Sequence, residues 1–66
     1  MTVAKTVEIS CDSETSFDDA IRTGIERASK TIRGIRGAWI KDQQVVVEDG
    51  KVTKYRVSMK ITFLLG

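Results

Sequence analysis

Two hydrophobic periods follow each other directly in a chain of only 66 residues. From Phe17 to Ile35, apolar side chains recur at three- and four-residue steps, which predicts a helix with one apolar stripe. A strict alternation then fills the C-terminal part of the chain, with apolar side chains at Val57, Met59, Ile61, Phe63 and Leu65. One helix on one small sheet covers a single sheet face, and a chain of this size gains only about 3–5 kcal/mol from its own core. The sequence therefore predicts that the chain completes its core by self-assembly.

The remaining segments supply the rest of a β-α-β-β order. Residues 3–10 and 37–47 alternate between apolar and polar side chains, which predicts two further strands. Asp49-Gly50, within the turn at 48–51, supplies the positive φ angles of a tight hairpin that leads into a third strand at 52–65. We therefore predict one α+β domain over residues 1–66, in which a three-stranded antiparallel sheet wraps around one helix.

The predicted helix has recognisable ends. Ser16 can act as an N-cap by accepting a hydrogen bond from the first turn, and Asp18 and Asp19 place negative charge at the positive end of the helix dipole. Gly34 is positioned to close the helix at its C-terminal end. Gly24 interrupts the apolar stripe at a cost of about 1 kcal/mol relative to alanine. We therefore expect the helix backbone to approach a strand closely at Gly24.

The composition argues against several classes of function. The chain contains no histidine, which is the commonest general base and transition-metal ligand. Its single cysteine, Cys11, cannot form an internal disulfide, and the sequence shows no nucleophile–base pair or phosphate-binding loop. The net charge of +2 is far from that of a dedicated nucleic-acid-binding protein. We therefore predict a protein that is not an enzyme and that binds no nucleic acid.

Two features of the sequence bear on localisation. No apolar run approaches the ~20 residues needed to span a bilayer. Residues 1–5 lack the basic region and apolar core of a signal peptide. We therefore expect a cytoplasmic protein with no membrane partner.

The order and spacing of several short motifs resemble the dodecin family of small flavin-binding proteins, over essentially the whole chain. The motifs are Lys5-Thr6-Val7-Glu8-Ile9, Ser16 before the helix, Ile25-Glu26-Arg27-Ala28, Lys30-Thr31-Ile32-Arg33, Glu48-Asp49-Gly50-Lys51-Val52 and Tyr55-Arg56-Val57-Ser58-Met59-Lys60-Ile61-Thr62-Phe63. The resemblance implies a hollow homo-dodecamer of cubic symmetry. It also implies passive sequestration or storage of a flavin (riboflavin, FMN or FAD) by ring stacking and a few polar contacts.

Three positions depart from the flavin site that the resemblance implies. The family places a tryptophan just after the helix, where its indole stacks on the isoalloxazine ring, and this position corresponds to Gly37. A glutamine of the last strand, which hydrogen-bonds the polar edge of the flavin, corresponds to Arg56. A basic residue of the second strand corresponds to Gln44. The resemblance therefore indicates a divergent member that lacks the usual tryptophan and glutamine.

Trp39 lies two residues beyond the usual tryptophan position. Residues two apart on a strand share a face and are separated by ~6.6 Å, so Trp39 could offer a stacking surface beside Gly37. Tryptophan is also enriched at interfaces, so Trp39 could instead fill a contact between subunits. The sequence leaves both roles open.

Arg56 also has two interpretations. Its guanidinium can donate hydrogen bonds to flavin carbonyls, but it cannot accept one from the ring N–H as a glutamine amide can. It could instead form a salt bridge with Glu48, Asp42 or a carboxylate of a neighbouring subunit. We take Trp39, Gln44 and Arg56 as the candidate flavin-binding residues.

A flavin-free shell with a structural or ion-binding role is the alternative function. Some dodecin-like relatives that lack the flavin tryptophan are associated with calcium, and they share an arginine at the glutamine position. The acidic cluster at Asp12, Glu14, Asp18 and Asp19 could supply carboxylates to calcium. The same residues could instead stabilise the N-terminal end of the helix.

Overall fold

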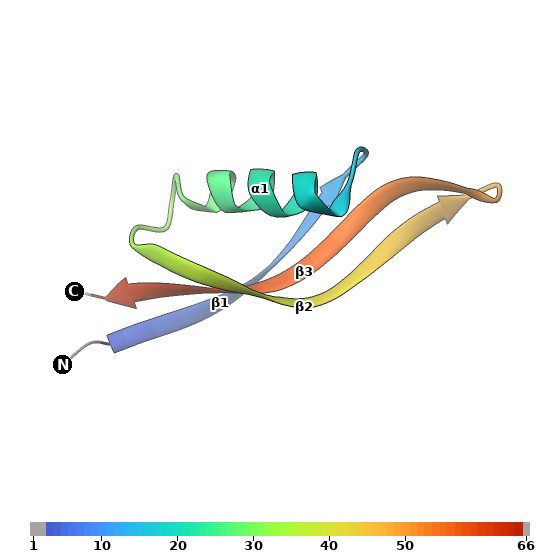
Figure 1. Cartoon of the computed structure of the whole chain (residues 1–66). Coiled ribbons are helices and arrows are strands. Elements are labelled where there is room, and N and C mark those ends of the chain that lie inside the picture. The colour runs from blue at the N-terminus through green and yellow to red at the C-terminus, as the bar shows by residue number, and fades with distance from the viewer. Residues whose placement is uncertain (1–2, 66) are drawn as a thin grey trace.

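A computed structural model describes residues 3–65 of the chain. It contains strand β1 (Val3–Ser13), helix α1 (Phe17–Ala28), strand β2 (Ile35–Glu48) and strand β3 (Lys51–Leu65) (Figure 1). The strands form one sheet in the order β1-β3-β2, and both neighbouring pairs are antiparallel. Helix α1 covers one face of this sheet (Figure 1). The predicted β-α-β-β fold, with a three-stranded antiparallel sheet and one helix, is confirmed.

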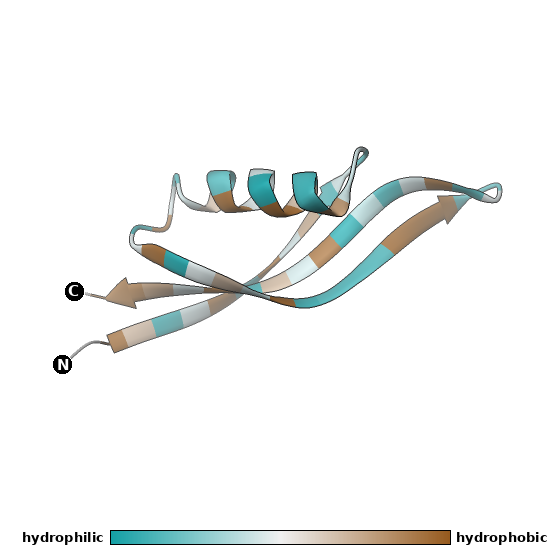
Figure 2. Ribbon diagram, viewed as in Figure 1, coloured by the Kyte–Doolittle hydropathy of each residue, from teal (hydrophilic) through white to brown (hydrophobic). Residues whose placement is uncertain are grey.

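The core lies between α1 and the central strand β3. Val57, Met59 and Ile61 alternate along β3 and are fully buried, together with Ala20 of the helix. The hydrophobic bands of α1 face the sheet, while its hydrophilic bands face away (Figure 2). The period-two and helical patterns therefore meet at one apolar seam, as the sequence predicts.

The N-terminal end of α1 is held by two serines. Ser16 is the N-cap, and its Oγ accepts a hydrogen bond from the Asp19 backbone N–H at 3.0 Å. Ser13, which is buried at the end of β1, donates its hydroxyl to Asp19 Oδ2 at 2.7 Å. The same Ser13 oxygen accepts from the backbone N–H of Thr15 at 2.9 Å. The predicted N-cap is confirmed, and Ser13 fixes the connection from the sheet into the helix.

The predicted C-terminal end of the helix is wrong. The helix ends at Ala28 rather than near Gly34. After Ala28 the backbone hydrogen bonds change to a three-residue spacing, as in Lys30 N–H to Arg27 C=O and Thr31 N–H to Ala28 C=O. Ser29 contributes to this by donating its hydroxyl to the Ile25 carbonyl at 2.8 Å. Gly34 has a φ of 76° and its carbonyl accepts from Leu64 N–H at 3.1 Å, so it leads into β2. Ile35 accordingly begins β2.

The hairpin between β2 and β3 follows the predicted turn chemistry. Asp49 and Gly50 have φ angles of 52° and 75°, which suit the tight hairpin turn that their sequence predicts. Each strand is longer than the sequence predicts, because pairing with β3 extends the ladders beyond the alternating segments. β1 continues to Ser13, and β2 runs from Ile35 to Glu48.

The helix is too short to cover the sheet. A helix of 12 residues is about 18 Å long, whereas the described chain extends over 51 Å. The β2–β3 hairpin projects past the helix (Figure 1). Three valines of the hairpin are exposed, namely Val45, Val47 and Val52. A single subunit therefore leaves apolar surface in contact with water, as the sequence predicts.

Gly24 marks the close approach of α1 to the sheet. A Cβ atom at this position would collide with Cys11 Sγ and would lie 3.1 Å from Met59 Cε. The absent side chain therefore lets the helix backbone lie directly against β1 and the buried seam. This confirms the predicted reason for a glycine on the apolar stripe.

We expect Gly24→Ala to destabilise the subunit by about 1–3 kcal/mol, because overpacking outweighs the gain in helix propensity. Chemical denaturation of the purified protein measures this change in the free energy of unfolding. Gly37→Ala is the matched control, since a Cβ there meets no atom within 4 Å and should be nearly neutral. Equal effects of the two substitutions would contradict the close approach at Gly24.

Candidate ligand-binding face

The sheet face opposite α1, which we call the helix-free face, carries the candidate site. Val57, Met59 and Ile61 point to the helix, so the even-numbered residues of β3 between them point the other way. Cross-strand pairing places three rows of side chains on this face: Glu8–Lys60–Trp39, Ser10–Ser58–Asp42 and Asp12–Arg56–Gln44. All three residues predicted from the sequence therefore lie on one face.

An irregularity in β2 makes this arrangement possible. The register shifts between Ile40 and Asp42, so that Lys41 has no partner of its own in β3. Such a bulge reverses the alternation, because one extra residue moves every later side chain to the other face. Without it, Trp39 and Gln44 would point to opposite faces of the sheet.

Trp39 is the most exposed large hydrophobic residue among those described, with 74% of its surface accessible. It lies beside Lys41 and Lys60, with which it lines a shallow pocket of about 200 Å³. Gly37 pairs with Thr62, and Trp39 pairs with Lys60, so both residues lie on the helix-free face. This confirms that Trp39 stands beside Gly37, about 6.6 Å along the strand.

Arg56 forms a bidentate ion pair with Asp12. Arg56 Nε donates to Asp12 Oδ1 at 2.7 Å, and Nη2 donates to Oδ2 at 3.2 Å. The expected partners Glu48 and Asp42 are wrong, because the register places Asp12 of β1 directly opposite Arg56. Gln44 lies on the other side of Arg56, on β2. The side chains of Arg56 and Asp12 remain 38% and 36% exposed.

The ion pair shifts the titration of both partners. Hydrogen bonding from Arg56 is the main cause that lowers the pKa of Asp12 below its ordinary value of 3.8, and the charges of Arg56 and Lys54 add to this effect. The same hydrogen bond raises the pKa of Arg56. Asp12 is therefore ionised at neutral pH and holds the guanidinium in place.

Trp39 and the Arg56 pair are separated along the face. Residues 60 and 56 of β3 are two rows apart, a distance of about 13 Å along the strand. The intervening row contains two small side chains, Ser10 and Ser58, and the carboxylate of Asp42. The structure therefore brings Gln44 and Arg56 together and places Trp39 two rows away on the same face.

Sequence reasoning missed two residue pairs of this face. Asp12 was considered only with the acidic cluster, and the Lys41–Glu8 ion pair, with Nζ to Oε1 at 3.0 Å, was not expected. Both pairs join strands that are more than 30 residues apart in sequence. The register of β3 with β1 determines the Asp12–Arg56 pair, and the Lys41–Glu8 pair also depends on the register of β3 with β2.

The acidic cluster does not form a metal site within one subunit. Among residues 3–65, no group of three or more histidine, cysteine, aspartate or glutamate side chains is arranged to hold a metal ion. Asp12 is bound by Arg56, and Asp19 accepts a hydrogen bond from Ser13. Within one described chain, the geometry therefore favours the other interpretation of Asp12, Glu14, Asp18 and Asp19, in which acidic residues stabilise the N-terminal end of the helix.

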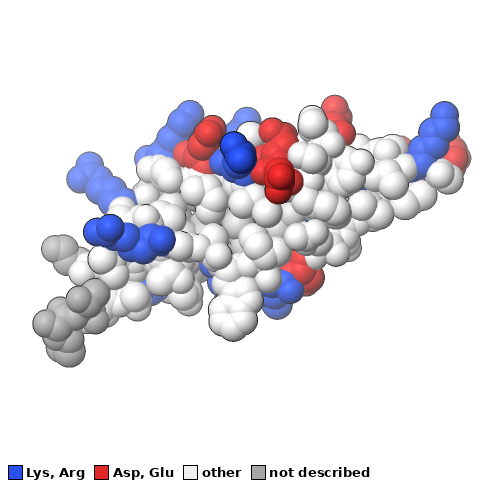
Figure 3. Space-filling view, in the orientation of Figure 1, with Lys and Arg blue, Asp and Glu red and all other residues white. Residues whose placement is uncertain are grey.

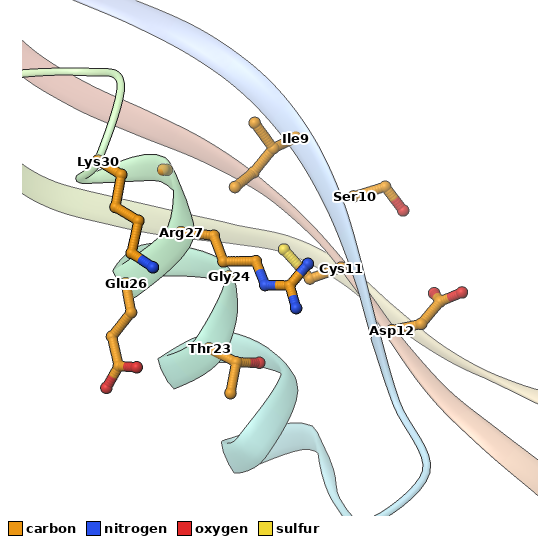
Figure 4. Close-up of a pocket in the computed structure, with 10 residues that line it drawn as sticks. Ile9, Ser10, Cys11, Asp12, Thr23, Gly24, Glu26, Arg27 and Lys30 are labelled. Atoms are coloured by element: carbon orange, nitrogen blue, oxygen red, sulfur yellow. The ribbon is translucent and has the colours of Figure 1, made fainter.

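A second concave feature lies between α1 and β1 (Figure 4). It is an open groove of about 780 Å³, with Ile9 and Cys11 on its strand side and Arg27 on its helix side. Burial, followed by the charge of Asp12, raises the pKa of the Cys11 thiol. The thiol is therefore protonated near neutral pH and is a poor nucleophile. None of the predicted site residues lines this groove.

The charge distribution gives no sign of a polyanion-binding stripe on the face seen in Figure 3. Acidic and basic side chains lie beside one another over the helix on this face (Figure 3). The expectation that the protein binds no nucleic acid stays a prediction. Within the described part of the chain, no helix has the length and apolar character needed to cross a membrane.

Comparison with known proteins identifies the family. A model of the dodecin family matches residues 3–66. The chain belongs to the dodecin family. It is 33% identical over 64 residues to the calcium dodecin of Mycobacterium tuberculosis, a match that covers 96% of this chain and 89% of that protein.

Solved dodecin structures have the same fold. Dodecin from Streptomyces coelicolor matches with a TM-score of 0.94 at 28% identity, covering 98% of this chain and 93% of that one. The crystal structure of the M. tuberculosis calcium dodecin, described as a calcium-chelating immunodominant antigen, matches with a TM-score of 0.84 at 29% identity. That match covers 97% of this chain and 91% of the other.

Family membership fixes the broad class of function. Dodecins are small, non-enzymatic ligand-binding proteins, so the expectation that this chain is not an enzyme is confirmed. The family commonly binds flavins and forms homo-dodecamers. The roles of Trp39, Gln44 and Arg56 stay predictions.

We expect the Asp12–Arg56 pair to make stability depend on pH in the acid range. The pKa of Asp12 is lowered on folding, so its contribution is complete above about 3.8 and is lost as the pH falls through the lowered value. Thermal unfolding at a series of pH values should show this loss. In Asp12→Asn, the unfolding temperature should fall less steeply as the pH decreases. Parallel profiles for the two proteins would contradict a linkage through Asp12.

Proposed function

We propose that this dodecin is a homo-oligomeric storage protein that sequesters a flavin, or a related planar aromatic ligand, on the helix-free face. Trp39 supplies the stacking surface, while Gln44 and Arg56 supply polar contacts at the opposite end of the same face. Binding is passive in this proposal, because it requires only stacking and hydrogen bonds. Flavin binding is common in the family, which supports this choice of ligand class.

The observation that carries the proposal is the exposure of Trp39. Trp39 is 74% accessible on the sheet face and lines a shallow pocket, so its indole is free to be covered by a ligand. An indole can stack on an isoalloxazine ring through its flat face. Lys41 and Lys60, which line the pocket with Trp39, can donate hydrogen bonds beside such a ring.

The departures at Gly37 and Arg56 lead us to propose a rebuilt site rather than a copy of the usual one. In this proposal, Trp39 takes over stacking from a position one row along the face. Gly37 supports it by leaving open space, since a Cβ there meets nothing within 4 Å. Arg56, held by Asp12, takes the place of the usual glutamine.

We also propose that twelve copies form a closed shell. The family forms homo-dodecamers, and one subunit leaves both outer strands, β1 and β2, with an unpaired edge. Closure of a shell hides such edges, which otherwise promote uncontrolled aggregation. The exposed valines of the hairpin are apolar surface that neighbouring subunits can cover.

We expect Trp39→Ala to weaken riboflavin binding by about 10- to 100-fold, because stacking on an aromatic side chain contributes roughly 1–3 kcal/mol. Quenching of riboflavin fluorescence measures the affinity, and Trp39→Phe should retain most of it. Trp39 is the sole tryptophan, so its own emission should fall in parallel for the unsubstituted protein.

The same titration distinguishes the other role of Trp39. Unchanged riboflavin affinity together with a smaller assembly would identify Trp39 as a subunit contact and would contradict stacking. An absence of quenching by the unsubstituted protein at tens of micromolar riboflavin would contradict the proposed function itself.

We expect Gly37→Trp to increase riboflavin affinity by about tenfold, because it adds a second indole to the same face at an open position. Isothermal titration of the intact assembly measures the change. Gly37→Ala serves as the control and should leave the affinity unchanged. A Gly37→Trp protein that assembles normally without binding riboflavin more tightly would show that the site is elsewhere.

A second candidate function is ion binding, which the 33% identity to a calcium dodecin favours. Since no metal-binding group is found within one described chain, such a site would have to combine carboxylates of neighbouring subunits. Calorimetric titration of the ligand-free assembly with calcium, with magnesium as the control, tests this function. Saturable, calcium-selective binding without riboflavin binding would favour it over flavin storage.

A further inference from the structure

We propose that Asp12 determines ligand specificity. Together with Arg56 it forms a hydrogen-bond donor and acceptor pair that recognises the imide group of the bound ring. The imide of a flavin is an N–H group between two carbonyls. In our proposal, Arg56 donates to a carbonyl and Asp12 accepts from the N–H. This inference rests on the proposed function and names the part of the ligand that the helix-free face recognises.

Neither side chain could perform this role alone. A guanidinium has five N–H donors and no acceptor, whereas an ionised carboxylate only accepts. Two Arg56 groups, Nε and Nη2, are used in the ion pair, and each Asp12 oxygen accepts one of these bonds. Both partners therefore keep unused hydrogen-bonding capacity next to each other.

The accessibility of the pair also suits this role. Both side chains remain more than one-third exposed, so a ligand can reach the outer edge of the pair. Cross-strand registry fixes Arg56 between Asp12 and Gln44, which limits the orientations of the guanidinium. The pair is thus pre-organised, so little entropy is lost when the ligand binds.

The ion pair favours a neutral imide over an anion. A phosphate or carboxylate that approached the remaining N–H groups of Arg56 would lie beside the ionised Asp12 carboxylate, which repels a second negative charge. A neutral ring edge meets no such repulsion. The row between the pair and Trp39 contains two small side chains, Ser10 and Ser58, together with Asp42 at its β2 end.

Two ligands that differ only in the substituent on the imide nitrogen test the inference. Riboflavin and 3-methylriboflavin are titrated into the purified full-length assembly, and quenching of ligand fluorescence gives both affinities. The methyl group replaces the imide hydrogen, so the wild-type protein should prefer riboflavin by about tenfold or more. Asp12→Ala should reduce this preference to about twofold or less.

Two further variants control the result. Asp12→Ala/Arg56→Gln should restore the preference, because one amide both donates and accepts. Glu8→Gln removes an exposed ion pair with Lys41 on the same face and should leave the preference unchanged. If Asp12→Ala does not assemble, the isosteric Asp12→Asn should lower the preference by about threefold, since the acceptor loses its charge.

The outcomes separate this inference from the proposed function. Equal wild-type affinity for the two ligands, or a preference that Asp12→Ala and Asp12→Asn leave unchanged, would overturn the role of Asp12 while flavin binding stands. Failure of the wild-type protein to bind either ligand would overturn both. Loss of preference in Asp12→Ala with recovery in the double variant is the expected result.

Discussion

The short helix is the constraint on which the rest of the structure depends. Twelve helical residues must cover a sheet whose central strand has 15 residues, so burial is concentrated at one seam around Met59. Gly24 allows that seam to close by bringing the helix backbone against Cys11. The β2–β3 hairpin extends beyond the helix, and its valines Val45, Val47 and Val52 stay exposed within the subunit.

The helix-free face owes its composition to register rather than to any local motif. Pairing of β1 with β3 sets Asp12 against Arg56, and the bulge at Lys41 turns Trp39 and Gln44 to the same side. Trp39 and the Asp12–Arg56 pair then lie two rows apart on this face, with Ser10, Ser58 and Asp42 in the row between them. The flavin-binding role proposed for this face depends on that arrangement.

The sequence predicted most of the fold because its signals were local. The alternation along β3 and the Asp49-Gly50 turn depend on neighbouring residues only, and both are present in the structure. The helix ended six residues before Gly34, because Ser29 and the bonds that follow it compete with continued helix. The partner of Arg56 could not be predicted, since it depends on a pairing 44 residues away. The three candidate site residues stay predictions: the dodecin resemblance supplied the positions of Gln44 and Arg56, and Trp39 was chosen because it lies two residues beyond the usual tryptophan position, Gly37.

The mass of the assembly in solution tests most directly whether one subunit is structurally incomplete. Native mass spectrometry or sedimentation of the purified protein at micromolar concentration measures this mass. Twelve copies of the 7.4 kDa chain give a particle of about 89 kDa, which is the expected result. A stably folded species of 7.4 kDa at the same concentration would contradict the account, because one helix and one sheet would then suffice.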